Sequence, residues 1–360
     1  MIRARPRRGR LRSALTSRLF GPAVSLAVVV AVFAFALPRL AGYSAAWDQV
    51  RQMTVPELVV LVLVALVNLS SYAWMWMAVL PGLAFWRAVM VEEASTAVAN
   101  TVPVGFAFGL GTIATMLHSC GRGAAEITRA VVLTGLWNNL VKLGAPLLAL
   151  GALALVGEAS GALRTASLFG LLVLAAAVAL LVLALVRPGT AHLLGRAAEG
   201  AAGRVARLRH RGPPTGWAER AEAFRTDSEH LLRRRWVYLT LAALGSHGLL
   251  FVVLLTCVRF VGGLSADVSW PHILAVFAVT RLITLVPITP GALGVAELSY
   301  VAGLVTVGVP SAIAAGAVLL FRALTWLLPI PIGATCWVLW RRGVGHRSQV
   351  HTEALAGSER

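Results

Sequence analysis

The sequence predicts an all-α fold, a polytopic bundle of transmembrane helices. Of its 360 residues, 58% are hydrophobic and only 13% are charged, and the mean hydropathy is +0.79. Soluble domains carry about 25% charged residues, whereas a chain that crosses lipid needs long runs without charge. This composition excludes a soluble globular protein and indicates an integral membrane protein.

Six apolar runs are each long enough for a spanning helix, which needs roughly 20 residues. They lie near residues 21–40, 57–80, 130–156, 165–186, 236–260 and 311–339. Two further apolar segments, near 94–118 and 271–308, are interrupted by Gly and Pro. The first run follows a basic segment but lacks a small-residue cleavage site, which favours an uncleaved helix. We therefore expect about six spanning helices and two interrupted elements.

Basic residues predict the orientation of these elements. Residues 1–18 contain seven Arg and no acid, the connection 187–235 carries eleven Arg against five acids, and the tail 341–360 opens with two Arg. The positive-inside rule places all three in the cytoplasm. This holds if the segment 94–118 enters and leaves from the cytoplasmic side and the segment 271–308 from the outside. We expect a transmembrane domain over residues 19–340 between two cytoplasmic termini.

The two interrupted segments resemble each other. The residues from Asn100 to Gly111 align with those from Ile283 to Gly294, and both contain Val-Pro followed by glycine-rich small residues. Paired interruptions of this kind are typical of an inverted repeat with a binding site near the membrane midplane. We predict such a repeat. The basic connection 187–235 fits either an amphipathic cytoplasmic helix on anionic headgroups or a solvated loop that only sets orientation.

The break between residues 281 and 297 is the most informative segment. Proline removes a backbone donor and glycine allows positive φ, so both interrupt a helix. Inside a bilayer, such backbone is tolerated only where it is buried in protein or lines a watery cavity. The segment therefore predicts a re-entrant element at a polar cavity. Its helix-breaking residues are Pro287, Pro290, Gly291 and Gly294.

Charged and polar side chains in this break fit two roles each. Arg281 and Glu297 either form an ion pair that pins the loop, or one of them contacts a lipid phosphate, which the planar guanidinium of arginine holds well. Thr289 either caps a broken helix or, with nearby backbone amides, binds an anion at the start of the following half-helix. These residues are the first candidates for a headgroup site.

Polar residues inside other apolar segments are the remaining candidates. Asn138 and Lys142 are four residues apart and share a helix face, and a lysine there lines a cavity or extends toward an interface. Arg322 in the last span is interpreted in the same way. Asn100 marks the tip of the first interrupted segment or caps its helix. The pair Glu92–Glu93, just before that segment, fits interfacial charges.

The sequence indicates no cofactor, metal or nucleic-acid site. The three Cys are isolated and fit small core residues, and no His has metal-ligand spacing. His247 fits a packing residue better than a proton carrier. The net charge of +17 accompanies no motif that reads DNA or RNA, so we assign it to topology and to anionic lipid.

The run R-x5-P-x-T-P-G-x2-G-x2-E resembles the hallmark of a known family, the lysylphosphatidylglycerol synthase transmembrane region, also called flippase-like. Its residues here are Arg281, Pro287, Thr289, Pro290, Gly291, Gly294 and Glu297. Members often carry a charged pattern after the first interruption, but the stretch from Pro103 to Gly111 is uncharged. This departure leaves the headgroup class open.

The resemblance implies a lipid transporter in a bacterial-type plasma membrane. It would move a phospholipid, aminoacylated in some members, or a polyprenyl-linked lipid, with Arg281, Glu297, Lys142 and Arg322 at an anionic headgroup. Its partners would be membrane lipids and a membrane or cytoplasmic transferase. Because the soluble aminoacyl-transfer domain of bifunctional members is absent, we expect no enzyme activity. Two alternatives stay open: a membrane-embedded transferase or accessory subunit using Glu297 as its acid, and a partner-binding membrane protein using the basic connection.

Overall fold

The computed structural model describes residues 47–48, 50–102, 105–157, scattered positions between 171 and 203, 216–262, 268–285 and 292–358. The predicted spans 21–40 and most of 165–186 lie outside the described residues, as do Pro287, Thr289, Pro290 and Gly291 of the break. All regular elements in the described ranges are helices, which confirms the predicted all-α class.

The chain divides into two compact units. Unit 1 comprises Met1–Ser70, Val89–Met116 and Leu249–Arg360, and unit 2 comprises Ser71–Ala88 and Leu117–Gly248. Both interrupted segments have most of their described residues in unit 1, whereas Asn138, Lys142 and His247 belong to unit 2. Each unit is therefore described by itself.

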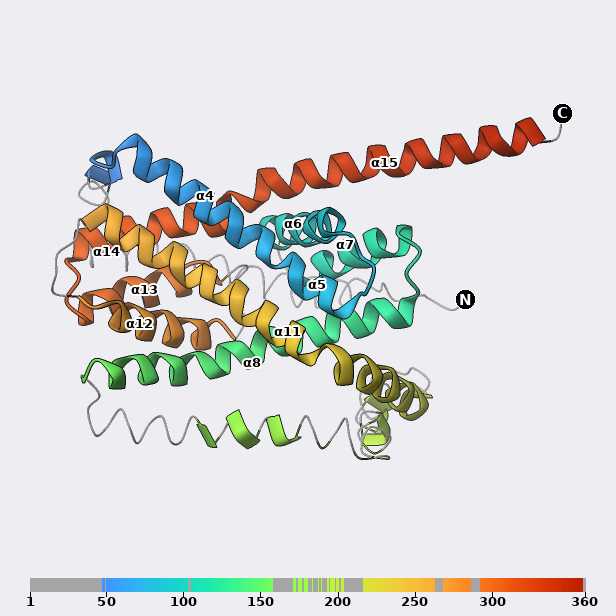
Figure 1. Ribbon diagram of the computed structural model, residues 1–360, viewed down its shortest axis with the longest axis horizontal. Coiled ribbons are helices and arrows are strands. Elements are labelled where there is room, and N and C mark those ends of the chain that lie inside the picture. Colours follow the sequence, from blue (N-terminus) through green and yellow to red (C-terminus); the bar gives the residue numbers. More distant parts are fainter. Residues whose placement is uncertain are drawn as a thin grey trace, which may run out of the picture. The chain divides into compact units, whose positions relative to one another are not determined.

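Long apolar helices occupy four of the predicted spans. They are Val55–Val79, formed by α4 (Val55–Ser71) and α5 (Ala73–Val79), then α8 (Ala124–Leu155), α11 (Trp217–Gly262) and the helix Ser311–Gly343. The last consists of α14 (Ser311–Arg322), the π-helix η3 (Ala323–Leu327) and the first part of α15 (Pro329–Ser358). Each is long and apolar enough to cross a membrane (Figure 1). The total of six spans stays a prediction.

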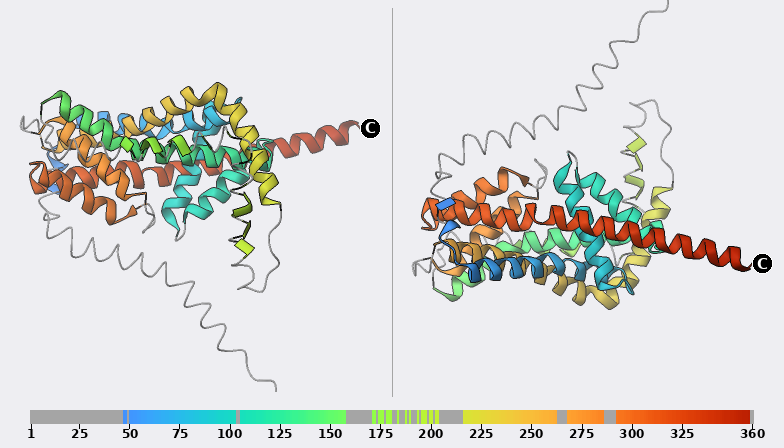
Figure 2. Two further views of the ribbon diagram at one scale, coloured as in Figure 1. Left: turned by 90° about the horizontal axis from the view of Figure 1, so that it is seen from below. Right: turned by 90° about the horizontal axis from the view of Figure 1, so that it is seen from above.

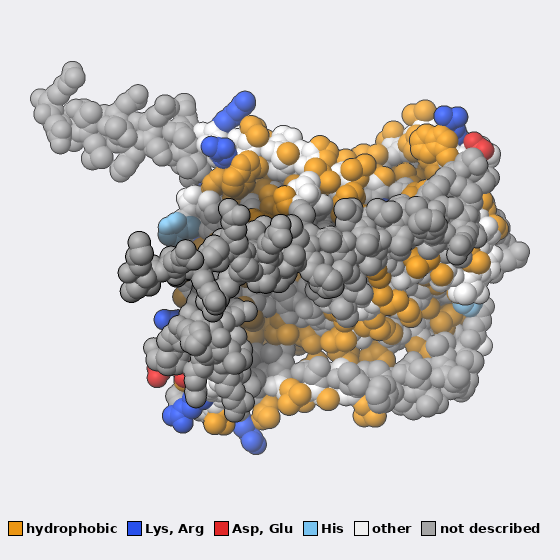
Figure 3. All heavy atoms as spheres, turned by 180° about the vertical axis from the view of Figure 1, so that it is seen from behind, with side chains coloured by type: hydrophobic (Ala, Val, Ile, Leu, Met, Phe, Trp, Pro, Cys, Tyr) orange, Lys and Arg blue, Asp and Glu red, His pale blue; other side chains and the backbone are white. Residues whose placement is uncertain are grey.

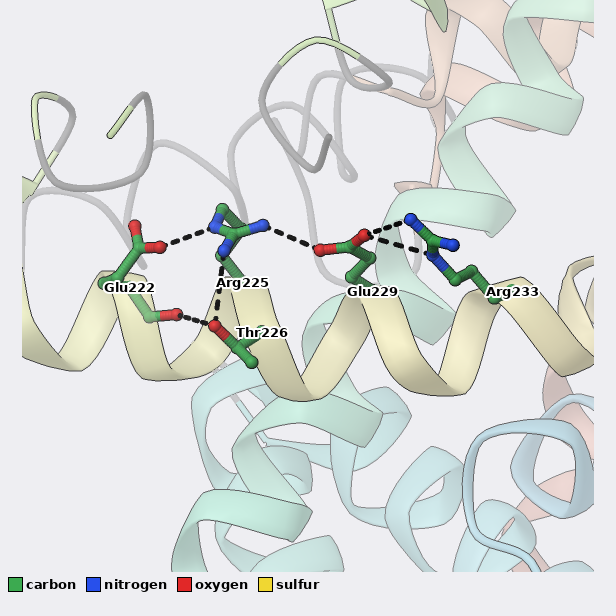
Figure 4. A network of polar contacts seen from close by, with 5 residues as sticks. All are labelled: Glu222, Arg225, Thr226, Glu229 and Arg233. Atoms are coloured by element: carbon green, nitrogen blue, oxygen red, sulfur yellow. Dashed lines mark hydrogen bonds and ion pairs between the residues drawn. The ribbon is translucent and has the colours of Figure 1, made fainter. Parts of the chain in front are cut away.

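Helix α11 is longer than the predicted run 236–260, because the charged residues before that run are also helical. Arg225 bonds Glu222 and Glu229, and Glu229 also bonds Arg233, at i,i+3 and i,i+4 spacings (Figure 4). Pairs at these spacings stabilise a helix directly. We refer to these four residues as the charge ladder. The end of the basic connection is thus a helix that continues into the apolar part of α11.

Each interrupted segment forms a pair of short helices. The first hairpin consists of α6 (Phe85–Thr101) and α7 (Gly105–Ser119), and the second of α12 (Trp270–Ile283) and α13 (Val295–Thr306) (Figure 1). These helices have 12 to 17 residues, which at 1.5 Å per residue gives roughly 18–26 Å. That is less than the ~30 Å of hydrocarbon in a bilayer.

Glycines let the two arms of each hairpin pack closely. A Cβ on Gly105 would collide with the backbone of Ala99, and one on Gly109 would lie 3.0 Å from the carbonyl oxygen of Ser95. In the second hairpin, a Cβ on Gly303 would lie 2.6 Å from Cγ1 of Val276. In the first hairpin, Gly105 contacts Ala99, whereas Gly109, further along the chain, contacts the earlier residue Ser95. The two arms of this hairpin are therefore antiparallel. The chain folds back on itself at both interruptions (Figure 2).

The described elements follow the same order twice. A long helix, a hairpin and a second long helix occur first as α4–α5, the first hairpin and α8. The order repeats as α11, the second hairpin and the helix that begins with α14. This order agrees with the internal repeat predicted from the two Gly/Pro interruptions.

An aromatic series forms the core around the second hairpin in unit 1. The ring centroids of Phe251 and Phe277 lie 5.6 Å apart, those of Phe277 and Tyr300 6.4 Å, and those of Tyr300 and Phe321 5.4 Å. The four rings come from α11, α12, α13 and α14 in turn. Aromatic pairs contribute about 0.5–1.5 kcal/mol beyond their buried area. The second hairpin is therefore packed between two long helices.

Apolar side chains also cover much of the outer surface. Along α4, Val59, Leu63 and Val67 are each about half exposed, and most of the coloured surface in Figure 3 is hydrophobic. Exposed apolar area of this extent is unfavourable in water and marks contact with membrane or protein. It suits a lipid environment, in agreement with the predicted class.

Candidate functional site

The second hairpin changes direction at a strained turn before α13. Gly294 adopts φ +82°, and Ala292 adopts φ +54°, a left-handed conformation that costs a non-glycine residue roughly 1–2 kcal/mol. The Oε2 atom of Glu297 accepts the backbone N–H of Gly294 at 2.6 Å. A helix start leaves such N–H groups without partners in the helix itself. Glu297 therefore fixes the first turn of α13, and its negative charge favours that helix end.

The second carboxylate oxygen of Glu297 holds an arginine of the last span. Its Oε1 atom accepts a hydrogen bond from Nε of Arg322 at 2.6 Å. The Glu297 side chain is 1% exposed and that of Arg322 15%, so the pair lies inside the apolar unit. Removing one partner of such a pair typically costs about 3–5 kcal/mol, because the other charge is left buried.

Arg281 lies in the last turn of α12, on the other side of the break. It is half-buried, and its positive charge is favourable at a helix C-terminus. The described ion pair of Glu297 is with Arg322, a pairing that the sequence does not indicate. The sequence singled out both residues of that pair, but 25 positions separate them and no local pattern joins them.

Directly after Arg322, the helix widens into the π segment η3. Such segments inside α-helices are frequent at functional sites. Nδ2 of Asn100, near the tip of the first hairpin, donates a hydrogen bond to the carbonyl oxygen of Trp326 in η3 at 3.0 Å. The Trp326 ring lies 6.0 Å from Cζ of Arg322. Asn100 therefore joins the first hairpin to the last span rather than only capping its own helix.

Glu93 occupies a buried position on α6, where an interfacial charge was expected. It is 2% exposed, and its Oε2 atom has no hydrogen-bond partner among the described residues. The expectation was wrong for Glu93 because α6 begins at Phe85 rather than near residue 94, which places Glu93 in the middle of a helix. Its spacing of seven residues from Asn100, about two helical turns, was the signal that both share a face.

Five residues of unit 1 form a set that we name the polar row; contacts join four of them, and Glu93 lies about two helical turns from Asn100 on α6. The row consists of Glu297, Arg322, Trp326, Asn100 and Glu93. The row begins on the second hairpin, follows the last span through η3, and continues along α6 of the first hairpin. The row thus joins both hairpins to the last span. The sequence of neither hairpin predicts this arrangement by itself.

The candidates in unit 2 have different surroundings. Asn138 and Lys142 are half-buried on α8, with the shared face that their spacing predicts. Close by, Nε1 of Trp137 donates to Oγ1 of Thr240 on α11 at 2.9 Å. His247 is 4% exposed, and its ring centroid lies 6.4 Å from that of Tyr72, as expected for a packing residue.

The arginines at the start of α11 are largely engaged with the protein itself. Arg233 and Arg225 hydrogen-bond Glu229 and lower the pKa of its carboxyl group, so this acid stays ionised (Figure 4). Arg235 donates to the carbonyl oxygen of Met77 at 3.3 Å. Arg234 is exposed and remains available to a headgroup. Arg204, Arg207 and Arg211, which belong to the basic connection expected on anionic headgroups, lie outside the described residues.

The cysteines are free thiols, and Cys257 is fully buried in the core, as expected of a small core residue. Cys120 and Cys336 are half-buried. Across the part of the chain that the structure describes, no three His, Cys, Asp or Glu side chains gather as metal ligands would. The chemistry of the described site is therefore that of the polar row, with one acid that is paired and one that is not.

A family model for the lysylphosphatidylglycerol synthase TM region matches residues 23–333. The chain belongs to this family. The match includes both hairpins and all five residues of the polar row, and it establishes a lipid-related membrane protein. A search of curated proteins found no match. The resemblance inferred from the break at residues 281–297 is confirmed.

Proposed function

We propose that this member of the lysylphosphatidylglycerol synthase transmembrane family moves a lipid between the leaflets of a bacterial-type plasma membrane. The substrate is a phospholipid or a polyprenyl-linked lipid whose polar headgroup passes along the polar row while its chains stay in the bilayer. The buried Glu297–Arg322 pair at the break of the second hairpin carries the proposal. Charges within a membrane domain are costly and typically mark the path of a polar substrate.

The two hairpins support this path in a second way. Their helices are shorter than a bilayer is thick, and their arms fold back, as expected of re-entrant elements. With both termini in the cytoplasm, the first hairpin enters from the cytoplasmic side and the second from the outside. Two such elements of opposite orientation suit alternating access, in which each side opens in turn around one site.

The charges of the site favour an anionic headgroup. Arginine binds phosphate through a planar fork of donors, and Arg281 and Arg322 lie on the two sides of the break. The backbone amide of Gly294 already donates to Glu297, so we assign the phosphate to arginine rather than to the start of α13.

A leaflet-exposure assay on purified protein in vesicles tests this function. A fluorescent phosphatidylglycerol is placed in one leaflet, and its appearance in the other is followed with the wild type, Arg281→Ala and Arg341→Ala. Arg341 is exposed near the end of the last span, so its substitution removes the same charge away from the site. We expect Arg281→Ala to slow transfer about tenfold, equivalent to roughly 1.4 kcal/mol. Equal rates for wild type and Arg281→Ala would contradict the proposal.

The alternatives receive less support from the geometry. A transferase would need Glu297 as a proton acceptor, but both of its oxygens accept hydrogen bonds, from Gly294 and from Arg322. A partner-binding role through the basic connection would rest on exposed arginines such as Arg234, since the arginines of the charge ladder pair with acids on the same helix. Neither alternative explains why the charges are buried.

A further inference from the structure

We propose that Glu93 is a proton-binding site and that its proton is coupled to lipid movement. The coupling rests on the function proposed above, whereas proton binding does not. Glu93 lies on α6 at its contact with α15, inside unit 1. It would take up a proton on its buried carboxylate and release it when the hairpin opens this contact to water.

The surroundings of Glu93 favour its neutral, protonated form. The residue is 2% exposed, and its Oε2 atom has no hydrogen-bond partner among the described residues. Burial penalises the charged form of an acid unless a cation or several donors compensate. Glu297, almost equally buried, has such compensation from Arg322. Glu93 is therefore expected to hold a proton at a position where no described cation compensates a charge, whereas Glu297 forms an ion pair.

The other titratable groups near Glu93 do not neutralise a negative charge. Glu92 precedes it on the same helix and would repel a second carboxylate. On α15, Cys336 lies three residues after Gly333, which packs against Glu93, and a thiol offers no positive charge. On α7, the residues from Gly105 to Met116 include no titratable side chain. Within the described segments, no basic group thus compensates a charge on Glu93, in contrast to the second hairpin.

Ionisation of Glu93 would act on a tight helix contact. A Cβ on Gly333 of α15 would collide with the carbonyl oxygen of Glu93 and lie 2.6 Å from Cβ of Ala97, so α6 and α15 touch at this point. Water would have to enter this contact to solvate a carboxylate. Protonation of Glu93 therefore favours the closed contact between α6 and α15, and ionisation of Glu93 favours an open one. This difference shifts the equilibrium between the closed and the open state.

The polar row connects this contact to the headgroup site. Asn100 lies about 10 Å further along α6, seven residues at 1.5 Å each, and bonds η3 at Trp326. The Nε1 donor of Trp326 is buried and has no partner among the described residues. Arg322 lies one turn before Trp326 on the same span and donates a hydrogen bond to Glu297. A movement of α6 is therefore transmitted to the helix that carries Arg322.

Infrared spectroscopy tests proton binding without lipid transport. Purified full-length protein in lipid is titrated with pH, and the carbonyl band of a protonated carboxylic acid is followed in the wild type, Glu93→Gln and Glu92→Gln. We expect a band that persists near neutral pH, is lost in Glu93→Gln and is kept in Glu92→Gln. Thermal unfolding confirms that both variants fold. An unchanged band in a folded Glu93→Gln variant would overturn the site.

A pH gradient across vesicles tests the coupling. If one proton accompanies each lipid, a gradient of one pH unit shifts the equilibrium leaflet ratio of the fluorescent lipid by up to about tenfold. We expect this shift for the wild type and Glu92→Gln and its loss in Glu93→Gln. A tenfold shift retained by Glu93→Gln would overturn the coupling. If the infrared band behaves as expected but the wild type moves no lipid, the proposed function fails and the proton site stands.

Discussion

The two hairpins share a shape but differ in how their acids are held. In the second hairpin, Glu297 bonds both the start of its own helix and Arg322 of the last span. In the first, Glu93 is as deeply buried, but its Oε2 atom has no partner in the described ranges. A paired charge fixes one arrangement, whereas an acid without a counter-ion can change its charge. The two hairpins thus have a similar helix arrangement, but the acid of the second is fixed by its partners and the acid of the first can change its charge.

The largest expected effect comes from replacing each acid by its neutral amide. Glu297→Gln leaves Arg322 buried without its anion, and we expect a loss of about 3–5 kcal/mol in the free energy of unfolding. Glu93→Gln, the matched control, removes no ion pair, and we expect a change below about 1 kcal/mol. Denaturant unfolding of both variants measures the difference. Equal losses would show that the two acids are held alike.

A smaller effect is expected from the glycines at which the arms touch. In Gly105→Ala, the added Cβ would lie 2.7 Å from the carbonyl carbon of Ala99, and we expect overpacking to cost about 1–3 kcal/mol. A Cβ on Gly111, on the same helix, meets nothing within 4 Å, and Gly111→Ala should stabilise by about 0.5–1 kcal/mol.

The second hairpin offers a milder version of the same change. In Gly303→Ala the neighbour is a side chain, Val276, rather than backbone, so we expect a loss smaller than for Gly105→Ala. Thermal unfolding ranks the three variants. A greater loss for Gly303→Ala would mean that the arms of the second hairpin pack more tightly than those of the first.

The smallest effect is expected at the link between the first hairpin and η3. Asn100→Ala removes one hydrogen bond to the Trp326 carbonyl, worth about 0.5–1.5 kcal/mol. Thr101 is a suitable control, because among the described residues its hydroxyl bonds its own helix, at Ala97 and Val98. Unfolding of Asn100→Ala and Thr101→Val compares them. Identical stabilities would mean that the link to η3 contributes nothing.

Hydropathy and Gly/Pro breaks predict the framework of this molecule because both act locally. The run 57–80 corresponds to a helix at Val55–Val79, and the break after Arg281 separates two short helices. Tertiary pairing is harder to predict. Glu297 and Arg322 were each candidates, but their ion pair depends on how α13 packs against α14. The number of spans and their orientation remain predictions from charge and length.

Two features of the site had little or no signal in the sequence. Glu93 was placed at the interface because the apolar segment was taken to begin at residue 94, although helix α6 begins nine residues earlier. The π segment η3 contains no Pro or Gly to mark it. Pro329 and Pro331 follow it closely, and each removes the N–H that would bond a carbonyl four residues earlier, at Thr325 and Leu327 of η3.

The π segment η3 also determines which way the last span faces. An uninterrupted α-helix turns about 100° per residue, so Arg322 and Gly333 would point in directions only about 20° apart. The π turn takes in one more residue than an α turn and rotates all that follows by about 100°. Arg322 meets Glu297 of α13, whereas Gly333 packs on Glu93 of α6. One extra residue lets a single helix present two separate faces, one to each half of the internal repeat.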